Sequence, residues 1–116
     1  PDIDKIIQYH RDLAAEYLKH LSQVSQVDTV VGGSCWLFGI LVEDRDNLAD
    51  YLKKFGIDVN MVHLRNDIFK VFGGKRLNLP NMNWIEPRYL YLPINPAVTK
   101  KDVQFITQKI KDFYNG

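Results

Sequence analysis

The run WLFGILV, residues 36–42, constrains the fold more than any other stretch of the chain. Side chains of a β-strand point alternately to opposite faces, and here both alternating sets are apolar. Charged and strongly polar side chains are missing from the run, so neither face suits direct contact with water. We therefore predict a strand over residues 35–42 that needs packing partners on both of its faces.

Three other segments show the spacing of amphipathic helices. Residues 2–21, 44–55 and 99–114 place apolar side chains three and four positions apart, with charged residues between them. An Asp at the start of the second segment is a plausible N-cap, and Gly56 stands where that helix would stop. Thr99 and Asp102 have the spacing of a capping box. We predict a helix in each segment.

Two further strands complete the expected fold. Residues 57–62, IDVNMV, alternate in polarity, and residues 88–94, RYLYLPI, end at a proline. The stretch GGKRLNLPNMNW is predicted to be a loop because of its Gly, Pro and Asn content. The resulting order is helix, strand, helix, strand, strand, helix. This order predicts a single α+β domain, with a small antiparallel or mixed sheet of three to four strands and helices packed on one face.

Helices on one face would leave the second face of the sheet open, although the strand at residues 35–42 is apolar there too. An exposed apolar surface of this size usually binds a partner. We expect either a second copy of the chain, giving a homodimer, or a larger domain of the same polypeptide.

Composition narrows the class of protein. The 116 residues carry 15 Lys and Arg against 14 Asp and Glu, a net charge of +1 with both signs interspersed. Such a chain lacks the basic field that nucleic acid or an anionic membrane surface would require, so neither is an expected partner. A single cysteine forms no internal disulfide, and a cytoplasmic location is the expectation. The first residue is Pro1 rather than Met, which is compatible with a processed or truncated piece of a longer protein.

The stretch VHLRNDIFKVF, residues 62–72, concentrates polar groups directly after a predicted strand. Arg65 can hold a carboxylate or phosphate through two parallel hydrogen bonds, and Asn66 and Asp67 can bind hydroxyl groups. His63 can donate or accept a proton near neutral pH. A structural alternative stays open, because Asn66 and Asp67 could cap a helix and Arg65 could pair with a nearby acid. His10 and His20 are interpreted as solvated helix residues rather than metal ligands.

Several motifs together resemble one family along nearly the whole chain. The family is the DegT and StrS group of sugar-nucleotide aminotransferases, which are fold-type-I pyridoxal-phosphate enzymes, and the resemblance is to their C-terminal small domain. RDLAAEYLKHL is similar to the family pattern R-x-x-A-x-x-Y-x-x-x-L, and WLFGILV to its first small-domain strand. RDNLADYLKKFGI resembles R-x-x-L-x-x-x-L-x-x-x-G-I, and LPINPAVTKKDVQFI resembles the closing strand, turn and helix. The LP of the family is found at Leu79 and Pro80.

The resemblance assigns a role to the polar cluster. His63 falls where the family has a histidine at the active-site cleft, although the usual continuation His-Tyr-x-Pro is replaced by HLRND. It implies that His63, Arg65, Asn66 and Asp67 bind the substrate, a nucleotide-linked keto sugar. It also implies pyridoxal phosphate as cofactor of the full-length enzyme, with an amino acid such as glutamate as the amino donor.

Residues 1–116 would then be one domain of that enzyme, with the large domain that binds the cofactor absent. The resemblance implies that the Schiff-base lysine and the cofactor contacts belong to the large domain, so we expect neither a catalytic residue nor a bound cofactor or metal in this chain. The hypothesis is a piece of an aminotransferase that is inactive alone. The alternative is a stand-alone binding or dimerisation module without catalysis.

Overall fold

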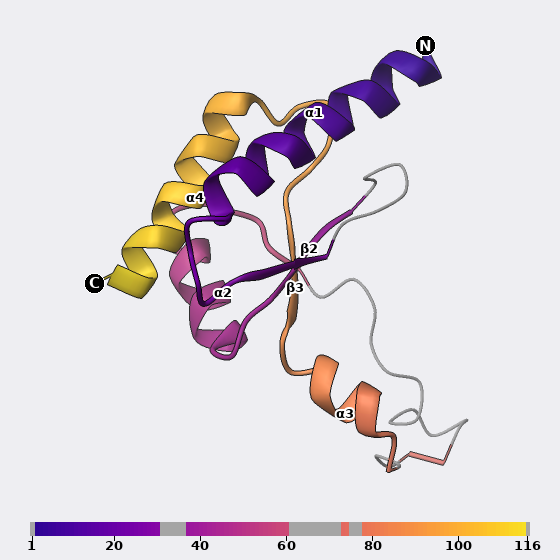
Figure 1. Ribbon diagram of the computed structural model, residues 1–116, viewed down its shortest axis with the longest axis vertical. Helices are drawn as coiled ribbons and strands as arrows, with labels where there is room; N and C mark the ends of the chain where they lie inside the picture. Colours follow the sequence, from indigo (N-terminus) through magenta and orange to yellow (C-terminus); the bar gives the residue numbers. More distant parts are fainter. Residues whose placement is uncertain (1, 31–36, 61–72, 75–77, 116) are drawn as a thin grey trace.

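The computed structural model describes residues 2–30, 37–60, 73–74 and 78–115. Within these ranges the chain forms four helices and a three-stranded antiparallel sheet, which confirms the predicted α+β class. In Figure 1 the three longer helices lie together on one side of the sheet, and the shortest helix stands apart from them. The elements in order are α1 (Ile3–Leu21), β1 (Asp28–Val30), β2 (Phe38–Leu41), α2 (Arg45–Lys53), α3 (Pro80–Ile85), β3 (Tyr89–Leu92) and α4 (Lys100–Asn115).

The register of the sheet sorts its side chains onto two faces. β2 is the central strand, and Ile40 lies opposite Thr29 of β1 and Leu90 of β3. Ile40 and Leu90 are buried under the helices, where Tyr17 of α1 stacks on Phe38 with ring centroids 4.7 Å apart. Further buried core residues come from every helix except α3: Leu13, Ala14 and Leu21 of α1, Leu48 and Leu52 of α2, and Val103, Ile106 and Ile110 of α4.

The second face of the sheet is also largely apolar, as the sequence predicted. It carries Gly39 and Leu41 of β2, Val30 of β1, and Tyr89 and Tyr91 of β3, together with one exposed acid, Asp28 of β1. Val30 is exposed, the two tyrosines are partly buried, and the Tyr91 ring lies over Gly39. A β-carbon at Gly39 would come within 3.3 Å of that ring, which explains why this position holds the smallest residue. Docking of a partner on this face stays a prediction.

Two observed elements, β1 and α3, were not predicted from the sequence. Two predicted strands are shorter in the structure than expected. β1 is only three residues long. α3 lies inside the stretch that was predicted to be a loop. It begins at Pro80, and proline is favourable in the first turn of a helix. The strand expected over residues 35–42 is observed as Phe38–Leu41, with Leu37 and Val42 described but outside it. Residues 35 and 36 lie outside the described ranges. The strand expected over residues 57–62 is an isolated bridge at Asn60, and residues 61–72 lie outside the description.

The helix ends confirm some capping predictions and correct another. The Thr99 N–H donates to Asp102 Oδ2 at 2.9 Å, and the Asp102 N–H donates to Thr99 Oγ1 at 3.1 Å, so the capping box is present. Gly56 has a φ of +77°, the left-handed conformation typical of the residue that follows a helix. The predicted aspartate at the start of α2, Asp44, occupies the N-cap, but its side chain makes no capping hydrogen bond.

Helix α1 departs from its predicted pattern at its N-terminal end. The apolar spacing over residues 2–21 includes Ile3 and Ile6, yet these two residues are 67% and 38% exposed because the helix extends beyond the sheet and α4 (Figure 1). His10, predicted to be solvated, is only 8% exposed. A search of the described residues found no helix long and apolar enough to cross a lipid bilayer.

Candidate functional site

The four residues predicted to bind substrate lie in the range 61–72, outside the described residues. Their role therefore stays a prediction, and the structure describes only the segments that lead into and out of this range. The residues concerned are His63, Arg65, Asn66 and Asp67.

The chain enters this range from the edge of the sheet. Asn60 pairs with Tyr91 of β3, where the Tyr91 N–H donates to the Asn60 carbonyl at 2.8 Å and the Asn60 N–H donates to the Tyr91 carbonyl at 3.2 Å. Val59 just before it is buried. Because β2 occupies the other side of β3, Asn60 marks the opposite edge. Asn60, the last described residue before this range, thus lies beside β3.

α3 precedes β3, and Arg45 of α2 binds the backbone at the junction between them. Arg45, the first residue of α2, is 7% exposed. Its Nη1 donates to the carbonyl of Glu86 at 2.7 Å and to the carbonyl of Tyr89 at 3.2 Å. Glu86 is the C-cap of α3, and Tyr89 is the first residue of β3. Asn60 and Glu86, the residues on either side of the stretch 61–85, are therefore both tied to β3, Asn60 directly and Glu86 through Arg45.

Charge around Arg45 is partly balanced. Its Nε donates to Asp46 Oδ1 at 2.7 Å, but the Asp46 side chain is 81% exposed, so water screens this ion pair. The guanidinium carbon also lies 6.0 Å from the centre of the Tyr89 ring, within cation–π range. Sequence reasoning placed Arg45 in a family motif without giving it a contact. A usable signal was present, because a cation in a first helical turn is disfavoured by the helix dipole.

A hollow of about 340 Å³ lies between α2 and the strand edge at Asn60. Its apolar lining comes from Ala49, Val59 and Leu90. The charged groups around it are Arg45, Asp46, Asp50 and Lys53. The hollow thus adjoins both Arg45 and the point where the chain enters residues 61–72.

The surface beside α3 carries a second arginine. Arg88 lies with its guanidinium 4.6 Å from the centre of the Trp84 ring, and its Nη1 donates to the Trp84 carbonyl. Its Nε also contacts Glu43 Oε1 at 3.2 Å. Trp84 is half exposed, so these contacts form a surface cluster rather than core.

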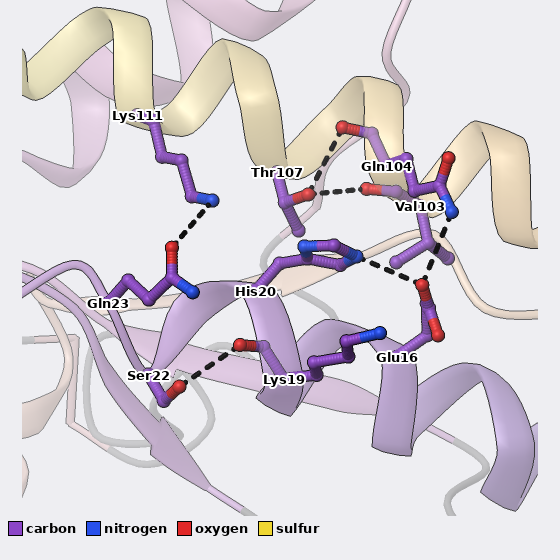
Figure 2. A network of polar contacts seen from close by, with 9 residues as sticks. All are labelled: Glu16, Lys19, His20, Ser22, Gln23, Val103, Gln104, Thr107 and Lys111. Carbon is purple, nitrogen blue, oxygen red and sulfur yellow. Dashed lines mark hydrogen bonds and ion pairs between the residues drawn. The ribbon is translucent and has the colours of Figure 1, made fainter.

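His20 of α1 belongs to a polar network between α1 and α4. His20 Nε2 lies 2.9 Å from Glu16 Oε1, which also accepts from Gln104 Nε2 of α4 at 3.4 Å. Figure 2 shows these contacts between the two helices. These two hydrogen bonds hold the pKa of the Glu16 carboxyl below its ordinary value. His10 is buried, and its Nε2 has no hydrogen-bond partner among the residues that the structure describes. In that part of the chain, no group of three or more His, Cys, Asp or Glu is placed to hold a metal ion.

Comparison with known proteins identifies the family. The DegT/DnrJ/EryC1/StrS aminotransferase family matches residues 1–111, whereas a comparison with curated proteins found no match. The sugar aminotransferase CalS13 from Micromonospora echinospora is similar in structure, with a TM-score of 0.86 and 25% identity, over 95% of this chain and 31% of that protein.

Two more solved structures share the fold. DesV from S. venezuelae, solved in complex with a ketimine intermediate, has a TM-score of 0.88 at 22% identity, over 97% of this chain and 33% of its own. The aminotransferase TlmJ from Streptoalloteichus hindustanus has a TM-score of 0.89 at 18% identity, over 97% of this chain and 32% of its own. The chain thus spans about a third of the length of these proteins. By its match over residues 1–111, the chain belongs to the DegT/DnrJ/EryC1/StrS aminotransferase family.

Proposed function

We propose that these 116 residues form the small domain of a pyridoxal-phosphate aminotransferase that transfers an amino group to a nucleotide-linked keto sugar. This proposal rests on a difference between how much of this chain the family matches and how much of a related enzyme this chain spans. The family matches 111 of the 116 residues, yet the chain spans only 31% of CalS13, a sugar aminotransferase. An amino acid such as glutamate is the proposed amino donor. A cytoplasmic location and a homodimer stay predictions.

The hollow beside α2 does not fit pyridoxal phosphate as a resident cofactor. The hollow beside α2 has one lysine in its lining, Lys53, which is exposed to water. A Schiff-base lysine needs a site that favours its neutral amine, and an exposed ammonium group lacks one. Arg45, the other cation there, already donates to Asp46 and to backbone carbonyls. We therefore propose that the cofactor lysine belongs to another domain, and we assign no chemical step to this chain.

The proposed contribution of this domain is to bind the sugar nucleotide. Arg65 would hold a phosphate or carboxylate group, and Asn66 and Asp67 would bind sugar hydroxyls. His63 would donate or accept a hydrogen bond at the same wall of the cleft. The position of Asn60 at the sheet edge supports this, because binding groups are often found on loops that follow a strand in a rigid sheet.

Half-reaction kinetics of the full-length enzyme test the proposal. Arg65→Ala should raise the KM for the sugar nucleotide by on the order of tenfold or more, because a charge-assisted hydrogen bond to the substrate is lost. The half-reaction with the amino donor should be unchanged. Lys101→Ala, which removes an exposed cation on α4, is the matched control. Unchanged sugar kinetics in Arg65→Ala would rule out the substrate-binding assignment.

The second candidate is a stand-alone module that self-associates without catalysis. The exposed apolar side chains favour it, since Val30 on the open sheet face and Trp84 on α3 are both about half exposed. The intact mass and absorption spectrum of the native gene product decide between the two. A product about three times heavier, yellow with bound cofactor, supports the enzyme, whereas a colourless product near 13.5 kDa supports the module.

A further inference from the structure

Helix α3 lacks the features that normally stabilise a helix. It is six residues long, none of them buried, and isolated helices of this length do not persist in water. Apolar side chains on and beside it are exposed, including Leu79, Met82, Trp84 and Ile85. The described core therefore contributes little to holding α3 in place. Among the described residues, polar contacts at its C-terminal end join α3 to the rest of the chain.

Two arginines supply those contacts. The last carbonyls of a helix have no partner within the helix, and a cation near them is favourable. Arg45 donates to the carbonyl of Glu86, and Arg88 donates to the carbonyl of Trp84. The two contacts differ in strength, because the Arg45 side chain is 8% exposed whereas the Arg88 side chain is 23% exposed. Arg45 reaches across from another helix and also binds Tyr89, so it joins α2, α3 and β3.

The position of Arg45 is unfavourable for α2 itself. As the first residue of that helix, it brings a cation to the positive end of the helix dipole. Its burial adds a desolvation penalty that hydrogen bonds and charge pairing must offset, and the ion pair with the exposed Asp46 is screened by water. The carbonyls of Glu86 and Tyr89 provide that offset from 41 and 44 residues along the chain. The contacts of Arg45 therefore serve the joint between the three elements rather than the stability of α2.

We propose that Arg45 is a positioning residue that fixes the end of the stretch 61–85, at α3 and the first residue of β3, against α2. Asn60, just before this stretch, pairs with Tyr91, and Arg45 donates to the carbonyls of Glu86 and Tyr89, just after it. This inference rests on the proposed function, in which the same stretch carries the groups that bind the sugar nucleotide. Arg45 acts on the substrate through these backbone contacts and does not touch it.

Arg45→Met and Arg45→Lys in the native full-length protein test the proposal, with Tyr9→Phe as the control. Tyr9 also donates a side-chain hydrogen bond to a backbone carbonyl, that of Val98, between α1 and the turn before α4. Arg45→Met should slow the sugar half-reaction by on the order of tenfold, as expected for loss of a charge-assisted hydrogen bond. The donor half-reaction should keep its rate. Arg45→Lys retains the charge and can reach one carbonyl, so it should fall between wild type and Arg45→Met.

Amide hydrogen exchange over residues 78–92 gives a readout that does not depend on activity. Exchange there should accelerate in both Arg45 variants and stay unchanged in Tyr9→Phe. If Arg45→Met does not fold, the comparison of Arg45→Lys with the wild type tests the proposal. Unchanged exchange, or equal losses in both half-reactions, would overturn the role of Arg45. A wild-type protein that transfers no amino group to any nucleotide sugar would instead overturn the proposed function, and exchange would then still report whether Arg45 holds α3.

Discussion

The same change, removal of a tyrosine hydroxyl, is expected to have opposite effects on stability at Tyr17 and Tyr114. Tyr17 is fully buried, and its hydroxyl donates to the carbonyl of Pro93 at 2.5 Å, joining α1 to the end of β3. The hydroxyl of Tyr114 in α4 is also buried, but it has no hydrogen-bond partner among the described residues. Replacing each tyrosine with phenylalanine removes one oxygen atom and leaves the ring in place. Only at Tyr17 does the change break a hydrogen bond.

The expected changes in the free energy of unfolding follow from this difference. Tyr17→Phe should destabilise by about 1–2 kcal/mol, because the hydrogen bond is lost and the Pro93 carbonyl loses its donor. The ring would keep its stacking on Phe38, which limits the loss. Tyr114→Phe should be neutral or stabilise by up to about 1 kcal/mol, because it removes a buried polar group without a partner.

Urea denaturation followed by tryptophan fluorescence measures both variants on the same chain. For a protein of this length, about 1 kcal/mol corresponds to a shift of roughly 4 °C in Tm, so thermal melts provide a second measure. Unchanged m-values would show that the variants differ in stability rather than in the extent of unfolding. A loss in Tyr114→Phe equal to that in Tyr17→Phe would refute the reasoning, because the hydrogen bond would then not account for the difference.

Two further predictions concern alkaline pH and a helix cap. Burial, with a smaller effect of Asp44, raises the pKa of Tyr114 from 10.0 to about 12, so the folded state favours the neutral phenol. The contribution of the neutral Tyr114 hydroxyl to the free energy of unfolding should be fully present below pH 10 and be lost as the pH rises toward 12. Urea titrations over this pH range should show a smaller loss of stability in Tyr114→Phe than in the wild type. An identical loss in both proteins would contradict the assignment. Thr99→Ala should cost about 1 kcal/mol because it removes half of the capping box, and the same titration at neutral pH measures it, with no loss counting against the cap.

Local sequence patterns predicted the three longer helices well. The spacing of apolar residues that marks α1, α2 and α4 is a property of each segment alone, and so is the capping box of Thr99 and Asp102. The central strand was predictable for the same reason, because its apolar residues are contiguous. The family followed from the order of several weak motifs, which the match over residues 1–111 confirmed.

Elements stabilised by distant partners were missed. β1 is three residues long and depends on pairing with β2, and α3 is held at its C-terminal end by arginines from outside it. The burial of His10 was likewise missed, because helical spacing alone does not show where neighbouring elements end. The candidate residues His63, Arg65, Asn66 and Asp67 remain predictions from sequence, since they lie outside the described ranges.

The sequence by itself therefore determined the fold class, the amphipathic helices and the family, because these depend on residue spacing and motif order along the chain. Only the tertiary structure decided what Arg45 contacts. Its acceptors are the backbone carbonyls of residues 41 and 44 positions further along the chain. Every residue has a backbone carbonyl, so no pattern of side chains marks these two as the partners of Arg45. The folded sheet brings those two carbonyls to the start of α2, and there a cation that is unfavourable for its own helix finds its partners.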